Sequence, residues 1–163
     1  MYKVENIGDT YCAVCGVPEE RRDHAVAMVR FAMDVRTKMQ VLTRQLMDRL
    51  GQGTDQLRVR IGIHSGSVVA GILRGQRAQS FKLLSGDTVH MAVAMMEKGK
   101  GNQIQVSMET AQWIIDAGKE RWLRQSETML EVPNKGQVQT FWIKDEALES
   151  KAKVVRTQKR QGE

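Results

Sequence analysis

Asp9 lies at the centre of the stretch whose residue types and spacing could do chemistry. It follows Gly8, and the pair stands between two runs rich in Val, Ile, Tyr and Cys, at 3–7 and 10–16. This pattern predicts a β-hairpin, because tight turns require the positive φ that glycine tolerates. A carboxylate at a hairpin tip can reach a bound cation without deep burial. From such a tip, the Asp9 carboxylate could reach a bound cation.

Both cysteines of the chain, Cys12 and Cys15, lie in the same stretch. Side chains three positions apart on a strand point to opposite faces of the sheet. The Cys-x-x-Cys pattern is therefore not expected to hold a metal ion. We expect reduced thiols, as in a cytoplasmic protein.

The composition is that of an ordinary soluble globular domain, with 163 residues, 41% of them hydrophobic and 27% charged. No apolar run approaches the ~20 residues that a membrane span needs. Much of the net charge of +6 lies at 151–160, within a C-terminal tail at 145–163. Because no aromatic residues alternate with its basic ones, the tail is typical of a solvated terminus, and no nucleic-acid partner is expected.

A long helix is predicted after the hairpin. From Ala25 onward, apolar residues recur at spacings of three and four positions, which marks one stripe of an amphipathic helix. The stripe consists of Met28, Ala32, Val35, Met39, Leu42 and Leu46. It fits a helix that lies on a sheet, and the length also allows a coiled-coil partner. Gly51 and Gly53 are expected to end the helix.

Two further helices are expected in the second half of the chain. One covers 88–97, with Asp87 or Thr88 as its cap. The other begins after Ser107, which is a good N-cap residue, and stops at Gly118.

Strands are predicted between the helices, and Gly66 is expected to join the first two of them as a tightly turned pair. The predicted strands are 57–65, 67–73, 81–84, 103–106, a strand near Trp122, and 140–144. Because two strand pairs are joined by tight turns, the order favours an α+β sheet with helices on one face over a doubly wound parallel sheet.

Four segments of the sequence carry a resemblance to a known family. They are KVENIGDTY at 3–11, RIGIHSGSVVAG at 60–71, GDTV at 86–89 and AGKERWL at 117–123. Together they resemble the catalytic domain of class III nucleotide cyclases, and are most similar to guanylate cyclase domains of algal and protist receptor-type proteins. The resemblance covers 1–144 as a partial catalytic domain. It implies a ferredoxin-like cyclase fold, a mostly antiparallel sheet with helices packed on it, whose N-terminal strand is missing from these residues.

The resemblance also implies a reaction, in which the ribose 3′-hydroxyl of GTP attacks the α-phosphate to give cyclic GMP and pyrophosphate. In the family, two Mg²⁺ or Mn²⁺ ions assist this step. Two domains pair head to tail, so that one supplies two metal-binding aspartates and the other supplies purine contacts, an Asn, an Arg and a Lys. The implied partners are GTP or ATP and a second cyclase domain, in a homodimer or a heterodimer.

On the metal side, Asp9 falls on the second metal-binding aspartate of the family, although an aspartate at this place also serves to cap a turn. Arg60 falls on an arginine that contacts the phosphates, and is otherwise an ordinary strand arginine. The first metal-binding aspartate belongs to a strand upstream of Met1, so the 163 residues do not contain it.

On the purine side, Glu5 falls on the glutamate that binds guanine in guanylate cyclases, and is otherwise an exposed strand residue. The second base contact falls near Lys82 or Leu83. The alignment does not decide between these two residues, because the loop at 76–85 carries extra residues.

Three positions depart from the family pattern. His90 stands in place of the ribose-orienting Asn, and Ala94 in place of the transition-state Arg. Pro133 replaces the phosphate-binding Lys, although Lys135 lies two residues away. Removing one group that stabilises a transition state costs roughly 10²–10³ in rate, so these departures predict weak or absent turnover.

Two functions follow from the resemblance. In the first, the chain is a guanylate-cyclase-type domain of cyclic nucleotide signalling, which is the metal-donating half of a dimer and inactive alone. In the second, it is a pseudo-cyclase that serves as a dimerisation or regulatory module. The expected location is the cytoplasm, either free or as the intracellular domain of a membrane receptor that is tethered through other parts of the parent protein.

Overall fold

The computed structural model describes residues 1–74, 79–83 and 86–144, and only the backbone of those at 5–7, 72–74 and 79–83. Its centre is a four-stranded sheet in the order β3-β6-β10-β7. These strands are β3 (Ile61–Ile63), β6 (Ile104–Ser107), β10 (Thr140–Ile143) and β7 (Leu123–Gln125). β3 and β6 are parallel, whereas β10 is antiparallel to both of its neighbours. The α+β class, with a mostly antiparallel sheet, is confirmed.

Two helices cover one face of this sheet. They are α1 (His24–Leu50) and α3 (Met108–Asp116). Both helices contribute to one apolar core with the sheet, in which Val29 of α1, Ile114 of α3 and Val106 of β6 are fully buried. The strand residues that reach this core alternate along β3 and β6, as expected for strands with one face toward the helices.

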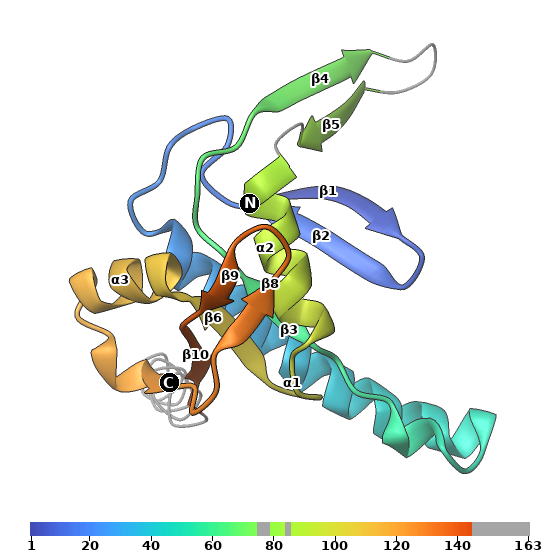
Figure 1. The fold of residues 1–163 in the computed structure, drawn as a ribbon. Helices are drawn as coiled ribbons and strands as arrows, with labels where there is room; N and C mark the ends of the chain where they lie inside the picture. The colour runs from blue at the N-terminus through green and yellow to red at the C-terminus, as the bar shows by residue number, and fades with distance from the viewer. Residues whose placement is uncertain (75–78, 84–85, 145–163) are drawn as a thin grey trace, which may run out of the picture.

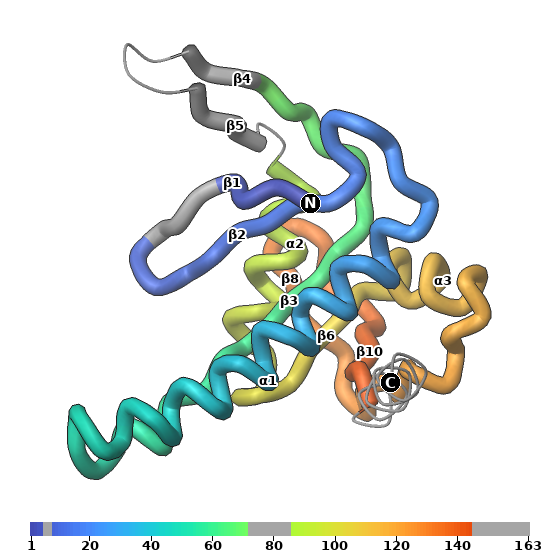
Figure 2. The backbone as a smooth tube through the Cα atoms, turned by 180° about the vertical axis from the view of Figure 1, so that it is seen from behind, coloured from blue at the N-terminus to red at the C-terminus, as the bar shows by residue number. Residues whose placement is uncertain are grey.

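The third helix, α2 (Gly86–Glu97), lies on the opposite face of the sheet (Figures 1 and 2). A Cβ atom at Gly62 of β3 would stand 2.3 Å from the carbonyl oxygen of Ala92 and 2.6 Å from the backbone nitrogen of Met96. The expectation of helices on one face is therefore wrong, because a glycine in β3 lets α2 pack directly against the other face.

Three hairpins complete the described fold (Figure 1). Their strands are β1 (Tyr2–Ile7) with β2 (Thr10–Val14), β4 (Ala70–Arg74) with β5 (Gln79–Leu83), and β8 (Leu130–Val132) with β9 (Gly136–Val138). The first hairpin agrees with the prediction, and the third was not predicted. Side chains of the third pack with α2 in a second apolar cluster.

The strand pairing predicted around Gly66 is wrong. β3 ends at Ile63 and pairs with β6, while β4 begins at Ala70 and pairs with β5. The alternation of apolar residues identified a strand at 57–65, although β3 is shorter. Alternation says nothing about the partner, which lies about 40 residues further along the chain, at Ile104.

The predicted helix caps had mixed outcomes. The Ser107 hydroxyl accepts a hydrogen bond from the Thr110 backbone nitrogen at 3.3 Å, so this cap is confirmed. α2 begins at Gly86, which places Asp87 and Thr88 inside its first turn rather than at the cap. The Thr88 hydroxyl instead donates to the carbonyl oxygen of Ser67 at 2.7 Å. The strand predicted near Trp122 is β7, and Trp122 itself ends the short 3₁₀ helix η2 (Glu120–Trp122).

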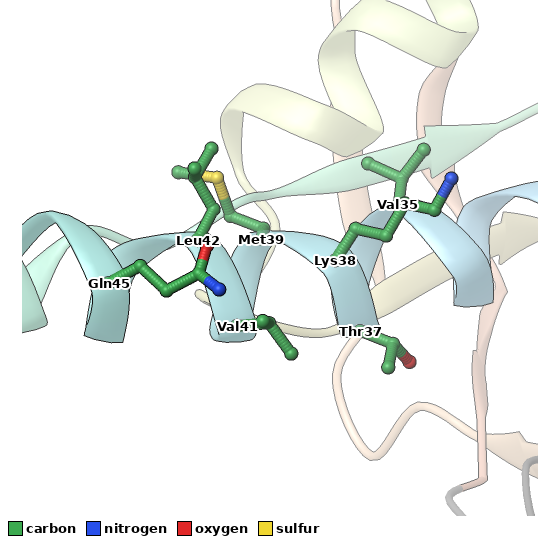
Figure 3. A pocket seen from close by; sticks show the side chains of 7 residues that line it. All are labelled: Val35, Thr37, Lys38, Met39, Val41, Leu42 and Gln45. Atoms are coloured by element: carbon green, nitrogen blue, oxygen red, sulfur yellow. The ribbon is translucent and has the colours of Figure 1, made fainter.

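The C-terminal half of α1 extends beyond the sheet (Figure 2). The predicted stripe is buried at Ala32, whereas Leu42 is 47% exposed. The helix therefore lies on the sheet only along its N-terminal half. A pocket follows the extended part (Figure 3), and its lining residues are Val35, Thr37, Lys38, Met39, Val41, Leu42 and Gln45. Among the described residues, no helix is both long and apolar enough to cross a membrane.

Candidate functional site

Asp9 lies at the tip of the β1–β2 hairpin. Ile7 stands opposite Thr10 in the register, so Gly8 and Asp9 form a two-residue turn. Gly8 has a φ of 59°, in the left-handed region that favours glycine. The Asp9 side chain is exposed. The predicted position of Asp9 is confirmed, and its role as a metal ligand stays a prediction.

The described residues do not by themselves form a divalent metal site. Within the described ranges, no group of three or more His, Cys, Asp or Glu side chains could hold a metal ion. Mg²⁺ and Mn²⁺ sites use carboxylate and other oxygen ligands, and here Asp9 offers a single carboxylate. The donor set therefore does not fit the pair of ions that the family uses.

Arg60 is held at the C-terminal end of α2. Its guanidinium donates to the carbonyl oxygen of Glu97 at 2.7 Å. The C-terminal end of a helix has free carbonyl groups and a partial negative charge, so a cation is stabilised there. In this structure Arg60 thus serves the end of α2. Its predicted contact with phosphates stays a prediction.

The two α2 positions that depart from the family have different surroundings. The His90 side chain is exposed. Ala94 is 8% exposed and belongs to the apolar cluster between α2 and the β8–β9 hairpin. The other members of this cluster are Met91, Met95, Leu130 and Val132, with Val138 packed against them. Ala94 is thus a core residue in this structure, with no polar partner around it in the cluster.

Replacing Ala94 with arginine should therefore destabilise the domain rather than restore activity. A guanidinium at this position would overpack the cluster, which typically costs about 1–3 kcal/mol. Urea denaturation of wild type, Ala94→Arg and the uncharged control Ala94→Leu would measure the change. A variant Ala94→Arg as stable as wild type would contradict the placement of residue 94 in the core.

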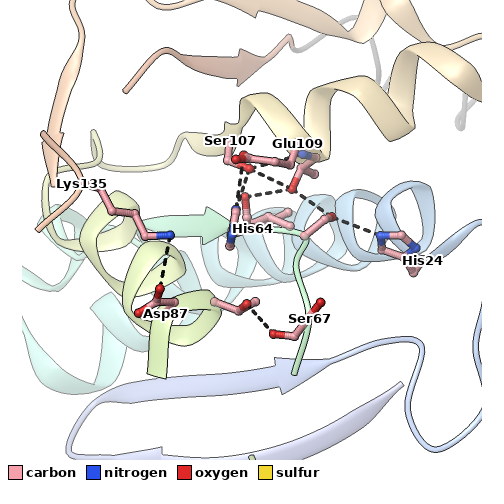
Figure 4. Close-up of polar contacts among 11 residues, drawn as sticks. His24, His64, Ser67, Asp87, Ser107, Glu109 and Lys135 are labelled. Atoms are coloured by element: carbon pink, nitrogen blue, oxygen red, sulfur yellow. Dashed lines mark hydrogen bonds and ion pairs between the residues drawn. The ribbon is translucent and has the colours of Figure 1, made fainter. Parts of the chain in front are cut away.

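Lys135 lies in the turn between β8 and β9 and reaches the first turn of α2 (Figure 4). Its Nζ atom is 3.9 Å from the Asp87 Oδ2 atom. Pro133 begins the same turn. The structure therefore brings Lys135 beside the start of the helix that carries His90, which places a cation near the end of α2 opposite to Arg60.

Two predicted base contacts lie outside what the structure describes. Glu5 belongs to β1 and pairs with Cys12, but its side chain is not among the described atoms. The same holds for the side chains of Lys82 and Leu83 in β5.

One polar cluster was not predicted (Figure 4). The His64 Nδ1 atom is 2.8 Å from the Ser107 hydroxyl and 3.6 Å from the Glu109 Oε2 atom. Burial lowers the pKa of His64, with the Glu109 carboxylate acting in the opposite direction and Lys135 in the same one. His64 is therefore held neutral at neutral pH. The sequence separation of 43 residues from Ser107 explains why no local pattern revealed the contact.

A model of the adenylate and guanylate cyclase catalytic domain matches residues 1–145. The chain therefore belongs to the adenylate and guanylate cyclase catalytic-domain family, which confirms the resemblance to class III cyclases.

Individual relatives agree with this assignment. The chain is 36% identical over 145 residues to the receptor-type guanylate cyclase gcy-28 of Caenorhabditis elegans. This alignment covers 88% of the chain and 11% of that protein. It is 33% identical over 144 residues to retinal guanylyl cyclase 1 of Bos taurus, covering 88% of the chain and 12% of that protein. The chain thus spans about a ninth of the length of these relatives.

A solved structure shares the fold. The guanylate cyclase domain of RhGC from Catenaria anguillulae, determined in complex with GTP, is 34% identical to the chain. The two agree with a TM-score of 0.67 over 88% of this chain and 71% of that one. The predicted cyclase fold is thereby confirmed.

Proposed function

We propose that the chain is a guanylate-cyclase-type domain of cyclic nucleotide signalling, which takes part in making cyclic GMP and pyrophosphate from GTP as the metal-donating half of a dimer. The observation that carries this proposal is the exposed carboxylate of Asp9 at a two-residue turn. Two named relatives are guanylate cyclases, and the domain of RhGC binds GTP. Support for guanine over adenine rests on Glu5 and on these relatives.

Asp9 would supply one carboxylate to a Mg²⁺ or Mn²⁺ site, and the remaining ligands would have to come from outside the described residues. Arg60 and Lys135 are proposed to bind the nucleotide phosphates, each after leaving its present partner. Arg60 would give up the carbonyl oxygen of Glu97, and Lys135 its weak contact with Asp87.

The domain is proposed to cover 1–144, followed by the basic tail at 145–163, which lies outside the described residues. We place it in the cytoplasm, free or as the intracellular domain of a membrane receptor. Its partner is a second cyclase domain, in a homodimer or a heterodimer, because the purine half of this chain is altered at His90, Ala94 and Pro133.

A second function, that of a pseudo-cyclase, is favoured by one observation. Ala94 is packed in an apolar cluster instead of presenting a cation to the nucleotide. In this case the chain would serve as a dimerisation or regulatory module without turnover.

A cyclic GMP assay separates the two functions. The 163-residue chain alone should give no cyclic GMP above background, since three groups of the purine half are replaced. The full-length protein, mixed with a family domain that keeps the Asn, Arg and Lys but has both metal-binding aspartates changed to alanine, should form cyclic GMP in the one complete site. If sedimentation demonstrates the dimer and the mixture still forms no cyclic GMP, the first function is contradicted and the pseudo-cyclase function is supported.

A further inference from the structure

Five side chains form a continuous polar chain from the start of α1, past the end of β3, to the start of α3 (Figure 4). At one end, the His24 Nε2 atom is 3.2 Å from the Ser65 hydroxyl, and at the other, the His64 Nδ1 atom is 2.8 Å from the Ser107 hydroxyl. Thr110 joins the two halves, with its hydroxyl 3.0 Å from Ser65 and 3.4 Å from Ser107. Three hydroxyl groups therefore separate two imidazole rings.

The direction of the hydrogen bonds along these five side chains is fixed at the His24 end. The His24 Nδ1 atom is 2.9 Å from the carbonyl oxygen of Arg21. A carbonyl oxygen only accepts hydrogen bonds, so Nδ1 of His24 must donate, and Nε2 of the neutral ring must accept from Ser65. The Trp113 ring packs edge-on against His24, with 4.9 Å between the ring centroids, and helps to hold the imidazole in place.

The hydrogen count then places the proton of His64. Each of the three hydroxyls supplies one hydrogen, while the four contacts of the chain need four. With Ser65 donating to His24, Thr110 donates to Ser65 and Ser107 donates to Thr110. Nδ1 of His64 must therefore carry the fourth hydrogen and donate it to Ser107.

Neighbouring groups favour the same form of His64. The Glu109 carboxylate lies 3.6 Å from Nδ1 and attracts the hydrogen at that atom. The carbonyl oxygen of Ile63, 3.4 Å from the Thr110 hydroxyl, is a second acceptor for Thr110. If Thr110 donates there, Ser107 still donates to Thr110 and Nδ1 of His64 still donates to Ser107.

Charges around the two rings differ. The His64 side chain is 7% exposed, and burial together with Lys135 opposes a positive charge on it, against the pull of Glu109. Asp87 faces Lys135 from α2 at 3.9 Å. His24 is only half-buried, and beside it the Arg21 guanidinium is paired with Asp23 at 2.8 Å. The surroundings of His64 therefore oppose a positive charge on its ring, whereas the charges beside His24 are paired with each other.

We propose that this row of five hydrogen-bonded side chains is a proton relay through which His24 and His64 take up one proton as a pair. Nδ1 of His64 gives its proton to Ser107, each hydroxyl passes its own proton to the next oxygen, and Ser65 gives its proton to Nε2 of His24. In the same concerted step His64 takes a proton from solvent hydronium at Nε2, so its ring stays neutral throughout. The net change is one proton bound, with His24 an imidazolium and His64 a neutral ring whose hydrogen has moved from Nδ1 to Nε2.

This relay would let the domain bind a proton without placing a positive charge beside Lys135. Lys135 then keeps its position near Asp87 when the pH falls. The device depends on the central hydroxyl of Thr110, which is fully buried.

Ring-nitrogen NMR during a pH titration tests the relay. The chain has three histidines, and His90, exposed on α2, serves as the internal reference. In wild type we expect the His64 nitrogen shifts to change from the Nδ1–H to the Nε2–H pattern at the same midpoint as His24 becomes charged. In Thr110→Val, which keeps the side-chain shape, the response of His64 at that midpoint should be lost, and Thr110→Ser should restore it.

Two further variants make the test decisive. Thr43→Val removes another buried hydroxyl, which donates to the Gln40 carbonyl of its own helix, and should leave the shared midpoint intact. Ser65→Ala removes the hydroxyl between Thr110 and His24 and should also abolish the response of His64 at the His24 midpoint. This variant keeps the relay testable if Thr110→Val fails to fold. The relay is overturned if wild-type His64 keeps its Nδ1 hydrogen while His24 is charged, if His24 takes up no proton while the fold persists, or if the shared midpoint survives both interruptions.

Discussion

Replacing Asp9 with alanine is expected to abolish cyclic GMP formation by the full-length protein mixed with the aspartate-free partner domain. Asp9 is the one described carboxylate that we place in the metal site, and its exposed position leaves it free to bind a cation. Loss of one group that stabilises charge in a transition state typically costs about 10²–10³ in rate. Chromatographic detection of cyclic GMP from GTP, with Mn²⁺ present, measures the loss.

A second carboxylate provides the matched control. Asp48 is exposed near the far end of α1, and Asp48→Ala should leave the rate of the mixture unchanged. Both variants should keep the unfolding midpoint of wild type, since both side chains are exposed. If the mixture with Asp9→Ala kept wild-type activity, Asp9 would not donate to the metal site. Its role would then be to cap the turn.

Glu5 distinguishes the two halves of the dimer. In the mixture, Glu5 of this chain would line the site whose Asn, Arg and Lys are replaced, so Glu5→Lys should not change the product. A switch from cyclic GMP to cyclic AMP in Glu5→Lys would mean that this chain reads the purine of the working site, which contradicts its assignment to the metal-donating half.

Features that depend on a few neighbouring residues could be predicted from the sequence. The turn at Gly8 and Asp9 followed from a glycine that tolerates positive φ between two strand-like runs. The Ser107 cap followed from a hydroxyl placed to accept the backbone hydrogen of Thr110. In both cases the physical cause lies within four residues of the signal.

Features that depend on distant partners were missed. Strand alternation marked β3 but not its pairing with β6, because the same alternation fits any neighbour that buries the same face. The face covered by α2 depended on an open position at Gly62, which reads in the sequence as one more glycine in a strand.

The candidate site shows the same division. The family pattern located Asp9 and Arg60 in the sequence, and Lys135 lies two residues from the family's lysine position. The present partners of Arg60 and Lys135 were set by packing. Arg60 binds the Glu97 carbonyl oxygen and Lys135 faces Asp87, across 37 and 48 residues of chain respectively. His64 was overlooked because its hydrogen-bond partner Ser107 belongs to β6 and its charged neighbour Glu109 to α3, both more than 40 residues further along the chain.

Placing a methyl group on Gly62 should be among the most destabilising single changes in the domain. The Cβ of Gly62→Ala would lie 2.3 Å from the Ala92 carbonyl oxygen and 2.6 Å from the Met96 backbone nitrogen. Both atoms belong to the backbone of α2, so no side chain can rotate away and the helix itself must move. Overpacking typically costs about 1–3 kcal/mol, and a displaced helix backbone should place this variant at or above the upper end. Urea denaturation would measure the change.

Gly86→Ala is the matched control, because the nearest atom to its Cβ is the Cε1 of His90 at 3.6 Å, an ordinary contact. Alanine also favours the helix more than glycine does, by up to about 1 kcal/mol in a helix interior, so Gly86→Ala should be neutral or stabilising. If Gly62→Ala were as stable as wild type, α2 could not lie against β3 as described. Because α2 carries Asp87, His90, Ala94 and the carbonyl that binds Arg60, the same displacement should also shift the NMR signals of His90. A destabilised Gly62→Ala with an unchanged His90 signal would mean that the strain is absorbed in β3 rather than in the helix.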